Sequence, residues 1–379
     1  MKEQRASQQA SDAGYGYIEI ADTRQLPAAV STHHTRGIQP TASAPRASAS
    51  RSDDGIDFSP RGRQTRVRNG WYYQFVFTWL QRIATPITDR FRETVSGSKS
   101  GTPDWALEMA LGTDEGLFGP ESAVWEIHGS LSTLVGGIRA LLLQAAHPAA
   151  LAGVAEHSRY ESDPLGRLAG TTRWLTVTTF GSTEVVNREA ARVNTIHARV
   201  TGRYLNRSGH THDYAARDFR FLLWVHCAFT DSFLKAHQAL GFPLTRGADR
   251  YVSEWRRSAE LLGLTGSPAS AAELERELQR FRDNDLVATE TTRRVIRFIL
   301  HPPFSRGALV FYRVLANAAI ATLDENDLRL LGLRKKHRGW LRLAFVGLVA
   351  LRAMLGDESP SQRLARDRIA RLQATSTPS

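Results

Sequence analysis

The sequence predicts an all-α protein, a single multi-helix globular domain preceded by a disordered N-terminal tail. From Trp125 onward, apolar residues recur with the helical period in one segment after another, separated by Pro and Gly. The alternation typical of strands is scarce, and its best candidate, Thr176–Gly181, lies within a helical context. With 379 residues, of which 42% are hydrophobic, the chain is long enough to bury a sizeable core.

Four regions are expected along the chain. Residues 1–69 are rich in Ser, Ala, Thr, Gln and Arg without a sustained period, which is typical of a disordered tail. An N-terminal helical lead-in, which begins with the aromatic run GWYYQFVFTWLQRI, is expected over residues 70–124. Residues 125–356 form the helical domain, and residues 357–379 a basic C-terminal tail.

Within the domain, each helix is expected where the apolar period runs between breakers. The first contains the His147-Pro148 step, where a kink is expected because proline disrupts a helix. The second follows Asp163 and Pro164, which suit a helix cap and a first helical position. The expected helices are Ile138–Glu156, Arg167–Phe180, Arg188–Leu205, Asp218–Leu240, Gly247–Leu262, Ala271–Phe281, Thr289–Leu300, Gly307–Ala321 and Arg338–Leu355.

Composition excludes several classes of protein. A single cysteine, Cys227, excludes a disulfide framework, a Cys₄ zinc site and an iron–sulfur cluster, and fits a reducing compartment. No apolar signal region follows Met1, and no apolar run approaches the ~20 residues of a membrane span. We therefore expect a cytoplasmic protein. The net charge of +11 comes without a nucleic-acid-binding motif, so no nucleic-acid partner is expected.

Familiar catalytic motifs are absent from the sequence. It contains no GxxxxGK[ST], HExxH or GxSxG, and no ExxH of the kind that di-iron bundles use. Cys227 lies inside the continuous helical pattern LLWVHCAFTDSFL, which argues against a thiolate-ligated haem. The histidines remain the best candidates for chemistry.

His197 lies on an unusual face of the expected helix Arg188–Leu205. Four arginines (188, 192, 199 and 203) fall on one stripe, whereas His197 faces away from them among small and apolar residues. This face leaves room for a flat ligand and lacks the further ligands that zinc or non-haem iron needs. The alternative is a core histidine with hydrogen-bonded ring nitrogens.

Four other residues are weaker candidates. His226 shares its face with large apolar side chains, so it is a core residue or an alternative metal ligand. His147 is a packed residue at the kink or a ligand. Arg167 and Thr171 are spaced i, i+4, and they would hold an anion, a haem propionate or bound oxygen unless Arg167 is a surface residue.

The order of four blocks is familiar. LLLQAAHPAALAGVAEHSRYESDPLGRLAGTTRWLTVTTFG, NTIHARVTG, LLWVHCAFTDS and YVSEWRRSAELLG together resemble the oxygenase MpaB family, which shares its catalytic domain with the latex-clearing rubber oxygenases. The resemblance covers roughly residues 125–356. It implies an all-helical fold around a b-type haem whose iron is held by one proximal histidine, at His197 here.

The resemblance also assigns the neighbouring positions. Arg167 and Thr171 match the arginine and threonine of the Arg-x-x-Lys-Thr set of the rubber-cleaving members, whereas Gly170 replaces its lysine. Asn194 and Thr201 stand where that branch has two arginines. The chain therefore resembles the broader branch of the family more closely than the rubber-cleaving one.

The expected function is that of a haem b-dependent oxygenase, which uses O₂ at a histidine-ligated iron on a lipophilic substrate, with an isoprenoid as the candidate. His197 is the predicted proximal ligand, and Arg167 and Thr171 are the predicted catalytic and cofactor-binding partners. The alternative is a non-catalytic protein, either a haem-binding module or a helical scaffold.

The C-terminal segment allows two interpretations. The helix Arg338–Leu355 is apolar nearly all round, which favours burial in the core with a solvated basic tail behind it. The alternative is a peripheral membrane contact through residues 338–373, in which basic residues meet anionic headgroups. The basic residues beyond the helix are Arg363, Arg366, Arg368 and Arg371.

Overall fold

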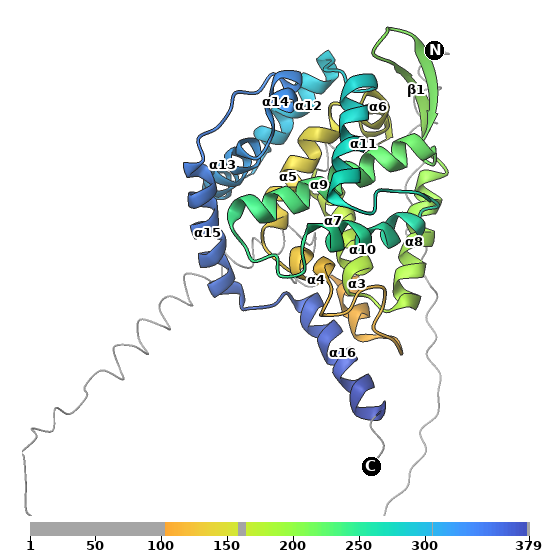
Figure 1. Cartoon of the computed structure of the whole chain (residues 1–379), viewed down its shortest axis with the longest axis vertical. Helices are drawn as coiled ribbons and strands as arrows, with labels where there is room; N and C mark the ends of the chain where they lie inside the picture. The colour runs from red at the N-terminus through yellow and green to blue at the C-terminus, as the bar shows by residue number, and fades with distance from the viewer. Residues whose placement is uncertain (1–102, 158–163, 305, 377–379) are drawn as a thin grey trace, which may run out of the picture. The chain divides into compact units, whose positions relative to one another are not determined.

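The computed structural model describes residues 103–157, 164–304 and 306–376, without the side chains of 154–157, 164–169 and 376. It confirms the all-α prediction, because every regular element in this part is a helix except one two-stranded sheet (Figure 1). The predicted tail and most of the N-terminal helical lead-in lie outside the described residues. The elements up to the sheet are α3 (Asp104–Leu107), η1 (Glu108–Ala110), α4 (Ala123–His128), α5 (Thr133–Gln144), α6 (Pro148–His157), α7 (Pro164–Phe180) and α8 (Thr183–His197).

The remaining elements follow the strands β1 (Thr201–Leu205) and β2 (Thr211–Ala215). They are α9 (Phe219–Leu240), α10 (Ala248–Glu260), α11 (Ala271–Asn284), α12 (Glu290–Leu300), α13 (Arg306–Ala321), α14 (Glu325–Leu331), α15 (Gly339–Leu355) and α16 (Pro360–Ser376). The long helix α9 packs along α5 at the centre of the domain, and α13 and α15 cover one side of this pair (Figure 1).

The central pair encloses a buried ion pair. Arg139 of α5 contacts Asp231 of α9 at 2.6 Å and donates a hydrogen bond to Ser232, at 2.9 Å. All three side chains are buried among apolar residues. Charges in such surroundings require partners, so this contact fixes how α5 lies against α9.

The predicted helix Ile138–Glu156 is interrupted completely at His147-Pro148. Helix α5 ends at Gln144, and α6 begins at Pro148, the position where the missing N–H of proline is harmless. The carbonyl of His147 accepts the N–H of Leu151, at 2.9 Å, and so starts the new helix. The expected kink is thus a junction between two helices.

The expected helix Arg188–Leu205 is wrong in its second half. Helix α8 ends at His197, and residues from Thr201 onward form β1, which pairs antiparallel with β2 from Thr201↔Ala215 to Leu205↔Thr211. The turn between the strands explains the change. The Asn206 side chain accepts the N–H groups of Ser208 and His210, and Gly209 adopts a positive φ of 81°.

The strand-like stretch Thr176–Gly181 belongs to the end of α7 and the turn after it. The Thr179 hydroxyl donates to the Leu175 carbonyl one helical turn back, at 2.7 Å, and also lies 2.9 Å from Nδ1 of His128. These contacts satisfy a polar side chain that is buried in a helix. Asp163, the expected cap of α7, lies outside the described residues.

Helix α16 occupies the stretch described above as a basic tail. Its Arg368 is only 1% exposed and donates to the backbone carbonyls of Met109, Asp114, Glu115 and Phe180. The Arg371 guanidinium donates to the Ala110 carbonyl, and Arg366 pairs with Glu358. The expectation that all four tail arginines meet solvent or lipid headgroups is therefore wrong for Arg368.

Helix α15 is only half buried, which corrects the expectation of a core helix. One stripe, Leu341, Ala344, Leu348 and Leu351, packs inward, while the opposite face is apolar and exposed. Among the described residues no single helix is long and apolar enough to cross a membrane. Helices α15 and α16 reach that length and composition only as a pair that is bent by 57°.

A buried histidine couples stability to pH. His128, at the end of α4, places Nδ1 2.9 Å from the Thr179 hydroxyl and Nε2 3.0 Å from the Tyr251 hydroxyl. Burial, helped by the charge of His237, lowers its pKa to about 3. The ring is thus neutral in the folded protein, whereas in the unfolded chain it binds a proton below about pH 6.5.

Because the unfolded state binds this proton first, stability should fall as pH drops from 6.5 toward 3, by up to about 1.4 kcal/mol per pH unit. We expect the variant His128→Gln to reduce the loss of unfolding free energy between pH 7 and pH 5 by about 2 kcal/mol. Urea titrations of both proteins at the two pH values measure this difference. Equal losses in the two proteins would show that His128 is not the titrating group.

Candidate functional site

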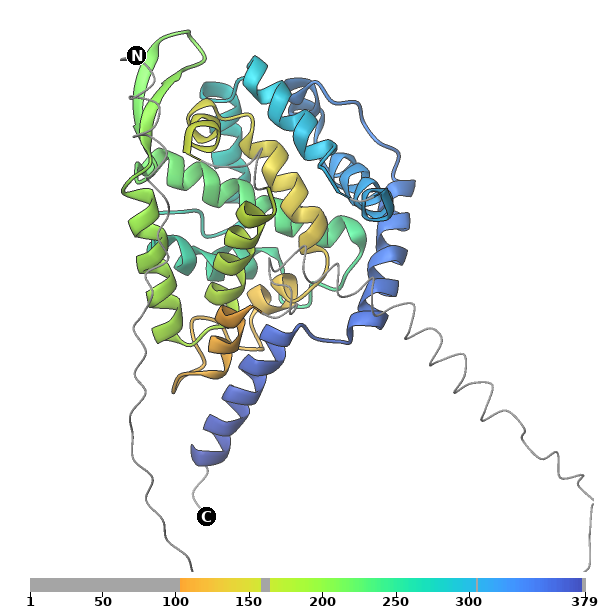
Figure 2. The same ribbon diagram turned by 180° about the vertical axis from the view of Figure 1, so that it is seen from behind.

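Helices α7 and α8 bring the predicted site residues to the same end of one structural unit. Only Gly181 and Ser182 separate α7 from α8, so the two helices form a hairpin in which they run in opposite directions. They diverge from this turn, with the end of α8 at the edge of the domain (Figure 2). The first turns of α7, with Arg167 and Thr171, and the last residue of α8, His197, therefore lie at the open end of the pair.

The closed end of the pair is tightly held. One carboxylate oxygen of Asp114 accepts the N–H groups of Thr183, at 2.9 Å, and Gly116, at 2.6 Å. Although burial raises it, these hydrogen bonds hold the pKa of Asp114 below its usual value. A Cβ on Gly116 would lie 1.9 Å from the Gly181 carbonyl oxygen, so only glycine allows this approach.

The end of α8 is fixed by contacts on both sides of the helix. The Arg217 guanidinium donates to the Asn194 carbonyl, at 2.9 Å, and the Asn194 side chain donates to the Leu261 carbonyl, at 3.1 Å. The chain then turns into β1 by way of the Val200 N–H, which donates to the His197 carbonyl. These contacts hold the backbone at the end of α8 in place, and none of them involves the ring of His197.

The ring of His197 is half buried and makes no hydrogen bond to any described residue, although Nδ1 is shielded from solvent. Burial, and to a lesser extent the charge of Arg217, lowers its pKa below 6.5. The imidazole is therefore neutral at physiological pH, which is the form that binds a metal ion.

The other two candidate histidines are enclosed. His147 is 2% exposed and packs its ring against Phe221, Trp224 and Phe281, and burial lowers its pKa to about 4. His226 is 9% exposed, and burial together with the charge of Arg256 lowers its pKa to about 4. Each has a buried Nε2 without a partner among the described residues. Both side chains are therefore enclosed by the protein, unlike that of His197.

Helix α7 supplies the remaining predicted positions. Arg167 and Thr171 lie one helical turn apart on the same face of the helix, and the side chain of Arg167 lies outside the described part. Gly170 is exposed, and a Cβ there would meet nothing within 4 Å. The position of the family lysine thus has room for a longer side chain.

The two positions that hold arginines in the rubber-cleaving branch differ in context. Asn194 lies in the last turn of α8 and holds the Leu261 carbonyl, whereas Thr201 begins β1. On one continuous helix both would share the face of His197, but the sheet removes Thr201 from it. The sequence signal that was missed is the Ser208-Gly209 turn between two short polar strands.

Alternative ligand chemistry finds no support in the described residues. No group of three or more His, Cys, Asp and Glu side chains there is arranged to hold a metal ion, but a haem iron with one axial histidine needs no such group. Cys227 is fully buried in α9, and burial raises the pKa of its thiol. The thiol therefore stays protonated, as expected for a core residue.

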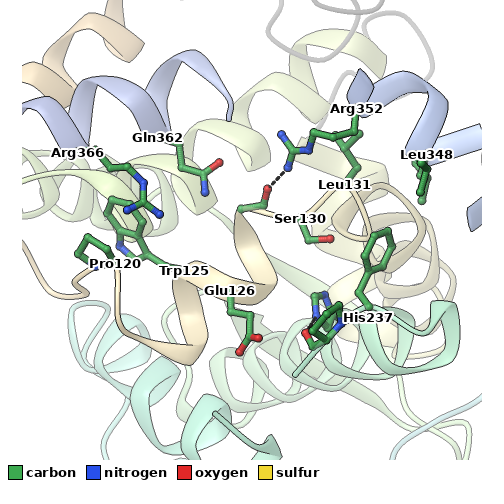
Figure 3. Close-up of a pocket in the computed structure, with 14 residues that line it drawn as sticks. Pro120, Trp125, Glu126, Ser130, Leu131, His237, Leu348, Arg352, Gln362 and Arg366 are labelled. Carbon is green, nitrogen blue, oxygen red and sulfur yellow. Dashed lines mark hydrogen bonds between the residues drawn. The ribbon is translucent and has the colours of Figure 1, made fainter. Parts of the chain in front are cut away.

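A pocket of about 400 Å³ lies away from His197, between the α4–α5 connection, the end of α9, α15 and α16 (Figure 3). Its walls include Trp125, Leu131 and Phe242, with Arg352 and Arg366 at its edge. His237 also lines it, but its ring nitrogens lie near the Ser132 hydroxyl and the Pro243 carbonyl. No residue predicted for the site lies in this pocket.

The fold and these residues define a class: a mostly helical protein in which the neutral imidazole of His197 lies at the open end of the hairpin formed by α7 and α8. The family comparison agrees. The chain belongs to the family described as "ER-bound oxygenase mpaB/B'/Rubber oxygenase, catalytic domain", whose model matches residues 125–355. No curated protein and no solved structure matches the chain.

Proposed function

We propose that the protein is a haem b-dependent oxygenase in which His197 is the proximal iron ligand. The observation that carries the proposal is the neutral imidazole of His197, which is half buried and bound to no described residue. Membership in an oxygenase family supports it. The enclosed positions of His147 and His226 make them poorer ligands.

The residues present fit such a group. The imidazole of His197 would hold the haem iron, and the bound haem would supply the iron chemistry that activates O₂. The protein holds the ligand in place through the Arg217 and Asn194 contacts at the end of α8. Arg167 and Thr171 are proposed to bind a propionate or orient bound oxygen.

Apolar side chains near the end of α8 favour a lipophilic substrate. Ile196, next to His197, and Phe219 at the start of α9 are both large, apolar and exposed. Exposed apolar side chains of this kind suit contact with an apolar molecule. An isoprenoid is the candidate substrate, whereas rubber cleavage is not proposed because Gly170 replaces the lysine of the rubber-cleaving members.

An absorption spectrum tests the proposal. The purified protein, or the protein reconstituted with hemin, should show a Soret band that reports one haem per chain. It should also consume O₂ when it is supplied with an isoprenoid alkene. A protein that remains without a Soret band after hemin addition would instead be a helical scaffold, and a Soret band without turnover on any alkene would indicate a haem-binding module.

The open space at Gly170 predicts a gain in stability. Replacing Gly170 with alanine should raise the free energy of unfolding by up to about 1 kcal/mol, because alanine favours an exposed helix. The matched control is Gly136→Ala in α5, where the new Cβ would lie 2.7 Å from Cδ1 of Phe233. Thermal unfolding should therefore move in opposite directions, and a destabilised Gly170→Ala variant would contradict the open geometry.

A further inference from the structure

Helix α15 presents an uncovered apolar face. Its outward side chains include Leu343, Phe345, Val346, Val349 and Met354, and Val346 is 63% exposed. On the neighbouring helix α13, Val310 adds a sixth exposed apolar side chain. We call these six residues the α13–α15 face. Large exposed apolar patches usually mark a surface of interaction.

Basic residues border this face without acidic residues among them. From Arg334 to Gly356 the sequence contains six Lys and Arg residues and no Asp or Glu. Arg334, Arg338 and Arg342 are exposed, and none of them pairs with an acidic side chain among the described residues. This cluster gives the end of α15 a positive charge beside its apolar surface.

The apolar surface continues into the pocket of Figure 3. Val349 belongs to both, and the ring of Phe345 lies 5.3 Å from that of Phe242, which lines the pocket. At the pocket edge the Arg352 guanidinium donates to the Gly129 carbonyl, at 2.5 Å (Figure 3). An apolar hollow bounded by guanidinium groups therefore adjoins the face.

We propose that the protein binds peripherally to anionic membranes through the α13–α15 face. Apolar side chains on one helix would enter the interface, and the arginines at its N-terminal end would meet anionic headgroups. In this proposal the basic residues that meet the membrane are those at the start of α15, and not the tail arginines beyond the helix, of which Arg368 is buried. The membrane contact is argued independently of the proposed function. Only its purpose, which is to place the enzyme where lipophilic molecules dissolve, rests on that function.

The basic cluster favours a membrane over other partners. In a symmetric pair of chains the same face meets itself, so two basic clusters would repel each other. Residues 71–83 of this chain are apolar enough to cover the face, but they contain Arg82 and no acidic residue. Neither occupant supplies negative charge, whereas an anionic bilayer does.

Helices α13 and α15, which carry the α13–α15 face, lie on the opposite side of the domain from α8, as both views show (Figures 1 and 2). Membrane binding and haem binding therefore involve separate residues. Failure of one leaves the other unaffected, so the two proposals can be tested separately.

Flotation of the full-length protein with vesicles tests the proposal. Vesicles of phosphatidylcholine with phosphatidylserine should bind the protein, and vesicles of phosphatidylcholine alone should bind it much less. Binding should weaken as salt rises. Val346→Glu should weaken binding at least about tenfold, whereas Leu205→Glu, at a residue that is 58% exposed on the opposite side, should leave it unchanged.

A variant that removes two positive charges measures the electrostatic contribution to vesicle binding. Arg338→Gln with Arg342→Gln should weaken binding about twenty-fivefold, since each basic residue near a membrane contributes about fivefold. The control, Arg199→Gln with Arg203→Gln, removes two exposed charges beside and on β1 and should change binding far less.

Three outcomes would overturn the proposal. Equal binding of the parent protein and Val346→Glu would place the membrane contact elsewhere. A dimer that Val346→Glu dissolves would identify a second copy as the partner. A lower melting temperature of Val346→Glu without any vesicle binding by the parent would show that another part of this chain covers the face.

Discussion

Replacing His197 with alanine is expected to abolish stoichiometric haem binding. The half-buried ring is the accessible neutral imidazole at the open end of α7 and α8, and the other candidate histidines are enclosed. Loss of an axial ligand should weaken hemin binding at least about a hundredfold, since even the outer partners of metal ligands affect affinity by tenfold to a hundredfold. Titration with hemin, followed at the Soret band, measures the loss.

Two comparisons separate ligation from folding. Added imidazole should restore a Soret band in His197→Ala, because the space left by the side chain admits the free ring. The matched control is His226→Ala, which removes an enclosed histidine and should retain haem. A native Soret band in His197→Ala together with its loss in His226→Ala would reassign the ligand to His226.

Replacing Arg368 with methionine should destabilise the protein by at least about 3 kcal/mol. Methionine keeps much of the side-chain volume but leaves the carbonyls of Met109, Asp114, Glu115 and Phe180 without their charged donor. Each buried acceptor that loses its partner costs about 1–3 kcal/mol. Urea denaturation measures the change in unfolding free energy.

Arg371 provides a matched control on the same helix. It is exposed and donates to a single carbonyl, that of Ala110. Arg371→Met should therefore cost less than about 1 kcal/mol. Equal effects of the two substitutions would mean that the α16 contacts act through net charge alone.

Much of the helical architecture could be predicted from the sequence. The apolar period located α9 to within one residue of its start, and the His147-Pro148 step marked the junction of α5 and α6. The error at Arg188–Leu205 has a physical cause. Val200, Thr201 and Tyr204 continue the helical period of α8 by coincidence, and the pairing of β1 with β2 is a contact with residues further along the chain.

The candidate ligand His197 could be singled out from the sequence, whereas two features of the fold could not. His197 stood out because its neighbours are small, and the structure shows its ring free of described partners. The role of Arg368 could not be seen, because four carbonyls from three distant segments meet only in the fold. The burial of only one side of α15 was equally hidden, since its outer face is as apolar as its inner one.

The anchorage of the Gly181–Ser182 connection fixes α8 at the end that lies far from the proposed ligand His197. The 15 residues of α8 span about 22 Å, so a rotation of 10° about that end would displace His197 by about 4 Å. Asp114 and Gly116 therefore contribute to the width of the opening between the two helices from its closed end, while the Asn194 and Arg217 contacts hold the other end of α8. Under the proposed function, substitutions of Asp114 or Gly116 would change which molecules fit beside His197, although neither position belongs to the candidate site.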